Sequence, residues 1–279
     1  MLVVNNASAG GGPYWARSAV HSCWLGQGAA LLGLSGPVDL GDLRSVMLGR
    51  GPSGAPLTSR PGLRHRHGWD LVLAAPKSFS LLAGTGPDWT GPEWTGPEWT
   101  GPPPGTPGLY QPYRDSVRDV VALLEQRAAW MRSGGANVPA NGVVAAAFEH
   151  VANDSGHPHL HAHVVLANLA AGANGQWGCL LGSELWRWRE GLGAAFHLAL
   201  RSRLTEAGFG FRWELSEGGA GEIVAVPWRA RSVASSRSQT LRETAHSFGS
   251  LSPAARRTAQ AKTRTGPKTD TGPKTDTGP

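Results

Sequence analysis

The sequence predicts an α+β fold, in which helices pack on a largely antiparallel sheet. Two observations lead to this prediction. Some segments repeat apolar residues at the spacing of a helix, while others are short apolar runs bounded by turn-forming residues, as strands are. These helices and non-alternating strands follow one another in an order that favours a sheet covered by helices.

The predicted elements begin with a strand at WDLVLAAP (69–76), which is apolar over a strand's length and stops at proline. A helix is expected over 113–135, where the segment ends on glycines. Its apolar stripe comprises Val117, Val120, Val121, Leu124, Ala128 and Met131.

Two more strands follow at 143–150 and 160–168, joined by a polar loop that contains Asn, Asp, Gly and Pro. A second helix is expected near Ser183–Ala207, and FRWELSEGGAGEIVAVP (211–227) then predicts a hairpin. The stripe of the second helix comprises Leu185, Trp188, Leu192, Phe196, Leu200 and Leu204.

Length and composition allow one large domain or two small ones, since the chain has 279 residues, of which 40% are apolar. Two segments differ from the rest: 85–108 repeats a TGP(D/E)W unit, and 265–279 repeats a six-residue unit. Proline removes N–H donors and glycine raises the ordering cost. We therefore predict a disordered surface insertion at 85–108 and a disordered tail at 265–279. A tryptophan binding strip is the alternative for the insertion.

The net charge of +6 is unevenly distributed along the chain. Residues 228–279 carry ten Lys/Arg and three Asp/Glu, whereas residues 1–227 carry sixteen and seventeen. Such a basic segment is compatible with nucleic-acid binding, and equally with a solvated chain end. Charge alone therefore does not decide between these functions.

No segment predicts insertion into a membrane, because the chain has no run of 18 apolar residues. The N-terminal segment lacks the charged start and long apolar stretch of a secretory signal. The two cysteines, Cys23 and Cys179, are far apart and form no disulfide framework. We therefore expect a reduced, cytoplasmic setting.

Five of the ten histidines fall within fourteen positions. Residues two apart on a strand share a face, so His161 and His163 point the same way. If the preceding strand pairs with theirs, His150 reaches that face. Three imidazoles without a nearby cysteine or carboxylate indicate a catalytic metal with open positions. The alternative is a histidine-rich turn without metal. His157 and His159 lie in the loop, where we expect solvation.

One divalent ion, Mg, Mn, Zn, Co or Ni, is the expected cofactor at these three histidines. Imidazole nitrogen suits Zn, Mn, Co and Ni, while Mg normally prefers oxygen ligands.

Several blocks of the sequence, in order, resemble the relaxase domain of TrwC-type (MobF class) conjugative relaxases, which belong to the HUH endonuclease superfamily. The resemblance covers roughly residues 14–264. It implies a relaxase domain over 1–264 with a palm-like α+β fold. The N-terminal blocks are WLGQGAALLGLSGPVD (24–39), HGWDLVLAAPKSFSLLAG (67–84) and AAFEHVANDSGHPHLHAHVVLANLA (146–170). The closing segment is matched by SVASSRSQTL (232–241) and ARRTAQAKTR (255–264).

This resemblance implies metal-dependent, site- and strand-specific nicking of DNA at a conjugative transfer origin, followed by strand transfer. A tyrosine attacks the phosphate and stays attached to the 5′ end. His150, His161 and His163 match the family's metal ligands, and the ion neutralises non-bridging oxygens. Asp70 matches an acidic residue implicated in tyrosine activation or histidine orientation. The implied partners are single-stranded or supercoiled origin DNA and transfer-apparatus proteins.

The nucleophile must come from three tyrosines, Tyr14, Tyr110 and Tyr113. The family carries its attacking tyrosine near the N-terminus, commonly within tyrosine pairs. We predict Tyr14, which is followed by Trp15 rather than by a second tyrosine. The preceding NNASAGGG is expected to be flexible, whereas Tyr110 and Tyr113 are expected at a helix start.

The sequence departs from the family pattern at Asn153–Asp154, where relatives usually have Ser-Arg and the arginine helps to bind phosphate. It also contains no G-x-x-x-x-G-K-[ST] loop of the helicase that often follows. These departures support an alternative function, a catalytically inactive relaxase-like DNA-binding remnant. A replication initiator with the same chemistry is a third hypothesis, although it would not share the flanking blocks.

Lys77 is the candidate DNA-binding residue. It follows the strand of Asp70 in a PKS turn, where the terminus of an element could meet a phosphate. The alternative is a solvated lysine.

Overall fold

The computed structural model describes residues 2–83, 108–133, 135–154, 156–215 and 221–233. The predicted disordered segments therefore lie outside the described residues, except for Gly108. Chain contacts divide the protein into two units, Met1–Pro227 and Trp228–Pro279. In the described part of the second unit, Trp228–Val233 forms helix α7. The domain boundary at residue 264 stays a prediction.

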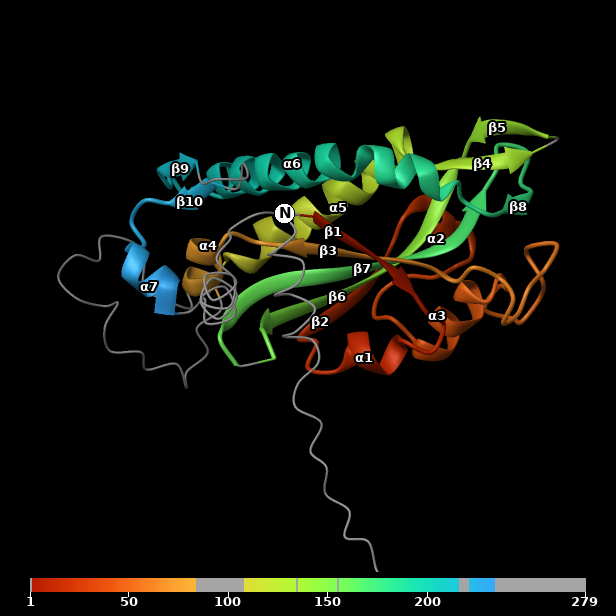
Figure 1. Cartoon of the computed structure of the whole chain (residues 1–279), viewed down its shortest axis with the longest axis horizontal. Coiled ribbons are helices and arrows are strands. Elements are labelled where there is room, and N and C mark those ends of the chain that lie inside the picture. Colours follow the sequence, from red (N-terminus) through yellow and green to blue (C-terminus); the bar gives the residue numbers. More distant parts are fainter. Residues whose placement is uncertain (1, 84–107, 134, 155, 216–220, 234–279) are drawn as a thin grey trace, which may run out of the picture. The chain divides into compact units, whose positions relative to one another are not determined.

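The first unit is built on an antiparallel sheet, as predicted (Figure 1). The fourteen-residue strand β7 lies at its centre, and a short strand β8 also pairs with it. The order across the sheet is β1 (Leu2–Ala7), β3 (Gly68–Ala74), β7 (Pro158–Ala171), β6 (Gly142–Ala152) and β2 (His21–Leu25), with β8 at Trp177–Gly178.

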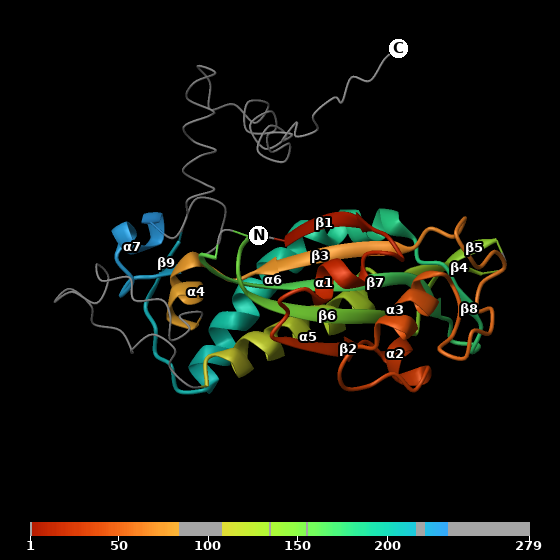
Figure 2. The ribbon, with the colours of Figure 1, turned by 90° about the horizontal axis from the view of Figure 1, so that it is seen from below.

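Helices cover both faces of this sheet, which is why its central strands are continuously apolar. Helices α5 (Tyr110–Arg127) and α6 (Gly182–Glu206) pack on each other over one face (Figure 1). Helices α1 (Gly12–Ala16), α2 (Gln27–Leu31) and α3 (Leu40–Met47) lie on the opposite face (Figure 2). A buried cluster joins the second group to the sheet and includes Trp15, Trp24, Ala29, Leu43, Met47, Phe148, Val165 and Leu169.

The predicted helix over 113–135 is shorter than expected. It ends at Arg127, and the chain turns into a hairpin of β4 (Trp130–Ser133) and β5 (Ala136–Pro139). Met131 therefore belongs to a strand, where it pairs with Val138 and is 3% exposed. Met131 fitted the spacing of the helical stripe because it is a buried apolar residue. Spacing alone does not distinguish a buried position in a helix from one in a strand.

The N-terminal segment is also more ordered than expected. Residues 2–7 form β1, which pairs with β3 and places Asn5 opposite Asp70. Leu2 and Val4 are buried, and helix α6 approaches closely where Gly193 faces Leu2. Burial of these two side chains against the body holds the segment, so the prediction that NNASAGGG is flexible is wrong for its strand residues.

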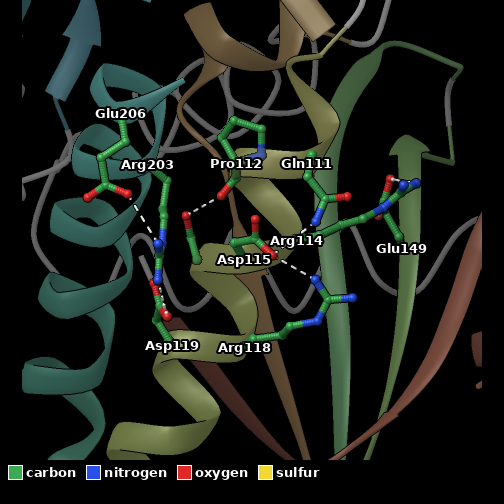
Figure 3. A network of polar contacts seen from close by, with 10 residues as sticks. Gln111, Pro112, Arg114, Asp115, Arg118, Asp119, Glu149, Arg203 and Glu206 are labelled. Atoms are coloured by element: carbon green, nitrogen blue, oxygen red, sulfur yellow. Dashed lines mark hydrogen bonds and ion pairs between the residues drawn. The ribbon is translucent and has the colours of Figure 1, made fainter. Parts of the chain in front are cut away.

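Polar contacts tie α5 to its neighbours (Figure 3). The Arg203 guanidinium of α6 binds both oxygens of Asp119 at 2.9 Å and also contacts Glu206. Arg114 of α5 donates to both oxygens of Glu149 on β6, at 2.7 and 3.2 Å. Glu149 is buried, whereas the Asp119 pair is more exposed.

Two further elements complete the described part of the first unit. Helix α4 (Lys77–Ala83) follows β3, and strands β9 (Trp213–Leu215) and β10 (Gly221–Ile223) form the predicted hairpin. The hairpin is joined to α4, because Ser78 Oγ accepts from the Ile223 N–H and Glu222 accepts from the Ser78 N–H. Within the described residues, no helix is both long enough and apolar enough to span a bilayer.

Candidate active site

The pairing of β6 with β7 brings three histidines onto one face of the sheet. His150 lies directly opposite His161, and His163 follows two residues along the same face. The ring centroids are 5.1 Å apart for His150–His161 and 5.3 Å apart for the other two pairs. The predicted convergence of His150, His161 and His163 is therefore present in the structure.

Hydrogen bonds assign one nitrogen of each ring and leave the other toward the cluster. His163 Nδ1 donates to Asp70 at 2.9 Å, and His161 Nδ1 donates to the His159 carbonyl at 2.7 Å. His150 Nε2 donates to the Arg17 carbonyl at 3.1 Å, while its buried Nδ1 has no hydrogen-bond partner among the described residues. One ligand atom from each histidine lies within 4.8 Å of the others.

Burial disfavours the charged form of two of these histidines. Burial lowers the pKa of His161 to about 4, opposed by the His159 carbonyl and assisted by His163 and His150. Burial, together with the neighbouring His163, also lowers the pKa of His150. Metals bind the neutral imidazole, so these rings need not lose a proton at pH 7 before they can act as ligands.

The donor set fits a divalent transition ion. Three imidazoles offer lone pairs, one of them from the buried Nδ1 of His150, which no described residue bonds. Since three protein ligands leave coordination positions open, oxygens of a substrate could occupy them.

Asp70 orients one of these histidines from the neighbouring strand. It lies on β3 opposite Val165 of β7, is 6% exposed, and accepts from His163 Nδ1 through both oxygens. A carboxylate in this position fixes the tautomer and the direction of a ligand imidazole. Of the two roles that the sequence resemblance offered, the geometry favours histidine orientation.

Trp15 is a residue of the site that the sequence did not indicate as functional. Its indole Nε1–H donates to Asp70 Oδ2 at 3.3 Å, and its side chain is 4% exposed. The two residues are 55 positions apart. No local pattern could have found this contact, and the only signal was the tryptophan that follows Tyr14.

Tyr14 lies beside the histidines. It projects from α1 with 65% of its surface exposed, and its ring meets the His163 ring edge-on with centroids 5.7 Å apart. Tyr14 is therefore an exposed side chain whose ring contacts one member of the three-histidine cluster.

The hydroxyls of the other two tyrosines are both hydrogen-bonded to backbone carbonyls. The Tyr113 hydroxyl donates to the Leu73 carbonyl at 2.9 Å, and complete burial raises its pKa well above the usual value. The Tyr110 hydroxyl donates to the Ala83 carbonyl at 2.6 Å, and burial raises its pKa. Both lie in the first turn of α5, as expected for a helix start.

His159 is not in a solvated loop. Strand β7 begins at Pro158, and the His159 ring stacks on His161 with centroids 4.8 Å apart. The prediction failed because the strand starts two residues earlier than its apolar residues indicate. His157 does lie in the turn between β6 and β7, as does the exposed Asp154.

Lys77 is the first residue of α4, and its ammonium donates to the Pro158 carbonyl at 2.9 Å. Burial lowers the pKa of Lys77, and the Glu222 carboxylate opposes this shift. The lysine thus ties α4 to the start of β7 and is not simply solvated. A DNA contact by Lys77 stays a prediction.

Comparisons with known proteins agree with this architecture. The family model described as TrwC relaxase matches residues 3–91 and 105–275. The multifunctional conjugation protein TraI of Escherichia coli is 31% identical over 250 residues, which is 85% of this chain and 13% of TraI. The chain thus spans about one eighth of that relative's length.

Two solved structures have the same fold. The copper-bound conjugative relaxase TrwC in complex with oriT DNA superposes with a TM-score of 0.79 at 23% identity, covering 98% of this chain and 93% of that one. TrwC with a 27-mer DNA that comprises the recognition hairpin and the cleavage site gives a TM-score of 0.78 at 23% identity, covering 96% and 92%.

Proposed function

The chain belongs to the TrwC relaxase family, and from this premise we propose that it nicks one DNA strand at a conjugative transfer origin and transfers that strand. The proposed intermediate is a covalent 5′-phosphotyrosine. The observation that carries the proposal is the exposed Tyr14, whose ring lies 5.7 Å from that of His163 in the three-histidine cluster.

The histidines and the tyrosine have separate roles in this mechanism. A divalent ion held by His150, His161 and His163 would supply positive charge to the non-bridging phosphate oxygens. Asp70 keeps His163 in the tautomer whose Nε2 faces the cluster. Nitrogen ligands favour Mn, Zn, Co or Ni over Mg.

The reaction exchanges one phosphate ester for another. The Tyr14 oxygen forms a bond to phosphorus as the bond to the 3′ oxygen breaks, and the 3′ oxygen leaves as a hydroxyl after taking up a proton. The phenol proton passes to solvent or to a nearby base. Because the energy of the broken bond is kept in the phosphotyrosine, a second 3′ hydroxyl can reverse the step without ATP.

Origin DNA is the proposed substrate, single-stranded or supercoiled. Support comes from the solved TrwC complexes, which contain oriT DNA and share this fold. The reaction would take place in the cytoplasm, where proteins of a transfer apparatus are the proposed partners.

Incubation with DNA of the cognate origin and Mn²⁺ tests the proposal. The expected product is a protein–DNA adduct that survives denaturing electrophoresis and is absent with EDTA. A Tyr110→Phe protein is the matched control and should form the adduct, because the Tyr110 hydroxyl is engaged by the Ala83 carbonyl. Failure to form an adduct on any cognate substrate would contradict the enzymatic function.

One feature favours the alternative function, a DNA-binding remnant without catalysis. The exposed Asp154 carboxylate lies in the turn between β6 and β7, close in sequence to His150, where the sequence resemblance implies an arginine. A negative charge there opposes phosphate binding. Origin-specific binding without adduct formation in the same experiment would support this alternative.

A further inference from the structure

Two contacts fasten the segment that carries Tyr14 to the histidine cluster. The Arg17 carbonyl at the end of α1 accepts from His150 Nε2, and the Trp15 indole donates to Asp70. Tyr14 therefore lies in a short helix that is anchored to the site at two neighbouring positions.

Packing restricts the position of the Trp15 ring. Its ring is buried in the cluster that joins α1 and α3 to the sheet. The ring also lies close to Gly11, where an added Cβ would come within 2.5 to 2.9 Å of three indole carbons. The close approach holds the indole in one place and aims its N–H at Asp70.

Asp70 is the point where these contacts meet. Its carboxylate is buried and accepts from His163 Nδ1 at 2.9 Å and from Trp15 Nε1 at 3.3 Å. His163 Nδ1 lies 2.9 Å from both oxygens of the carboxylate, and the Trp15 donor adds a second contact to Oδ2 alone, which restricts rotation of the carboxylate further. The direction of the His163 ring therefore depends on Trp15 through Asp70.

We infer that Trp15 is a positioning residue, which sets the direction of His163 through Asp70 and fixes Tyr14 relative to the same histidine. The effect of Trp15 on His163 concerns metal binding alone. Its effect on the placement of Tyr14 rests on the proposed function. Trp15 stands where the sequence resemblance implies a second tyrosine, so the contact between its indole and Asp70 is a feature of this chain.

The first test measures Mn²⁺ or Co²⁺ affinity by calorimetry without DNA. Trp15→Phe keeps an aromatic ring but loses the indole donor, and the affinity should fall by roughly 10- to 100-fold, as for other groups that orient metal ligands. Trp24→Phe is the matched control, because Trp24 is buried in the same cluster as Trp15. The metal affinity of the Trp24→Phe protein should equal that of the wild type. Equal affinities for wild type and Trp15→Phe, or equal losses in the two variants, would overturn the inference.

A second pair of variants reaches the same contact without changing Trp15. Gly11→Ala must displace the indole, so it should lower the metal affinity, as Trp15→Phe does. Gly10→Ala should not, because the nearest atom to its added Cβ is Ser8 Oγ at 3.9 Å. No loss in a folded Gly11→Ala protein would contradict the proposed route.

Non-additivity separates positioning from general destabilisation. In an Asp70→Ala background the indole has lost its acceptor, so Trp15→Phe should cause no further fall in metal affinity. An independent second loss would show that Trp15 acts through packing alone. These binding measurements hold whether or not the protein nicks DNA. Reduced adduct formation by Trp15→Phe at saturating metal would in turn test the placement of Tyr14.

Discussion

At the scale of single residues, the site depends on which nitrogen of each histidine is free. Asp70, the His159 carbonyl and the Arg17 carbonyl each take one ring N–H, and the second nitrogens converge. The sequence predicted the three histidines because residues two apart share a face of a strand. Strand spacing could not predict the partners of these rings, since Asp70 and His163 are 93 residues apart, and only the family resemblance indicated Asp70.

His161→Ala should abolish stoichiometric binding of a divalent ion, because one of three converging ligands is lost. His157→Ala should change the affinity little, since His157 lies in the turn outside the cluster. Calorimetric titration with Zn²⁺ or Mn²⁺ measures both. Equal losses in the two variants would instead indicate a diffuse histidine-rich turn.

Acid should destabilise the metal-free protein in a defined range of pH. Burial lowers the pKa of both His161 and His197 to about 4, against roughly 6.5 in an unfolded chain. Between these values the unfolded state binds more protons, so stability is lost as the pH falls from about 6.5 toward 4.

Thermal unfolding in EDTA should therefore show a lower Tm at pH 5 than at pH 7. His197→Leu removes one of these groups, so its Tm should depend less on pH than that of the wild type. The same pH dependence in both proteins would contradict the assignment for His197.

At the scale of elements, the predicted strands and helices of the core are present, and the errors occur where tertiary contacts decide. Strands β6 and β7 and helix α6 lie where their patterns indicated. Strand β1 was missed because it is stabilised by α6 and by β3, whose paired residues run from Leu2↔Leu73 to Ala7↔Gly68 and are thus far away in the sequence. The hairpin of β4 and β5 was missed because Met131 is buried at a position that also suits a helix.

The two ion pairs of α5 should differ in their contribution to stability. Arg114→Met leaves the buried Glu149 carboxylate without its partner, so the free energy of unfolding should fall by roughly 3 kcal/mol. Arg203→Met breaks a more exposed pair, so its effect on the free energy of unfolding should be clearly smaller. Urea unfolding of the two variants measures the difference. Similar losses would show that burial of Glu149 does not control the effect.

At the scale of the whole molecule, positive charge is concentrated in one part of the sequence. Residues 228–264 carry eight Lys/Arg and one Asp/Glu, whereas 265–279 carries two of each. Charge that neutralises phosphates makes binding salt-dependent. The pI of about 9.9 therefore reflects residues 228–264 rather than the terminal repeat.

Replacing Arg256 and Arg257 together with Gln should weaken DNA binding and flatten its dependence on salt. The slope of log K against log[salt] should fall by about 1.4 if each arginine neutralises one phosphate of a single strand. Replacing Lys268 and Lys274 together with Gln is the matched control. These lysines alternate with Asp270 and Asp276, so their replacement should leave the slope unchanged. Equal changes for the two pairs would contradict this division of charge.

Identification of the residue that carries the DNA shows directly whether Tyr14 is the nucleophile. The adduct formed on the cognate origin is digested with protease and nuclease, and the modified peptide is sequenced by mass spectrometry. We predict that the nucleotide is attached to Tyr14, and that Tyr14→Phe forms no adduct while it keeps its affinity for metal and DNA. Attachment at Tyr110 or Tyr113, or an adduct that survives in Tyr14→Phe, would contradict the account.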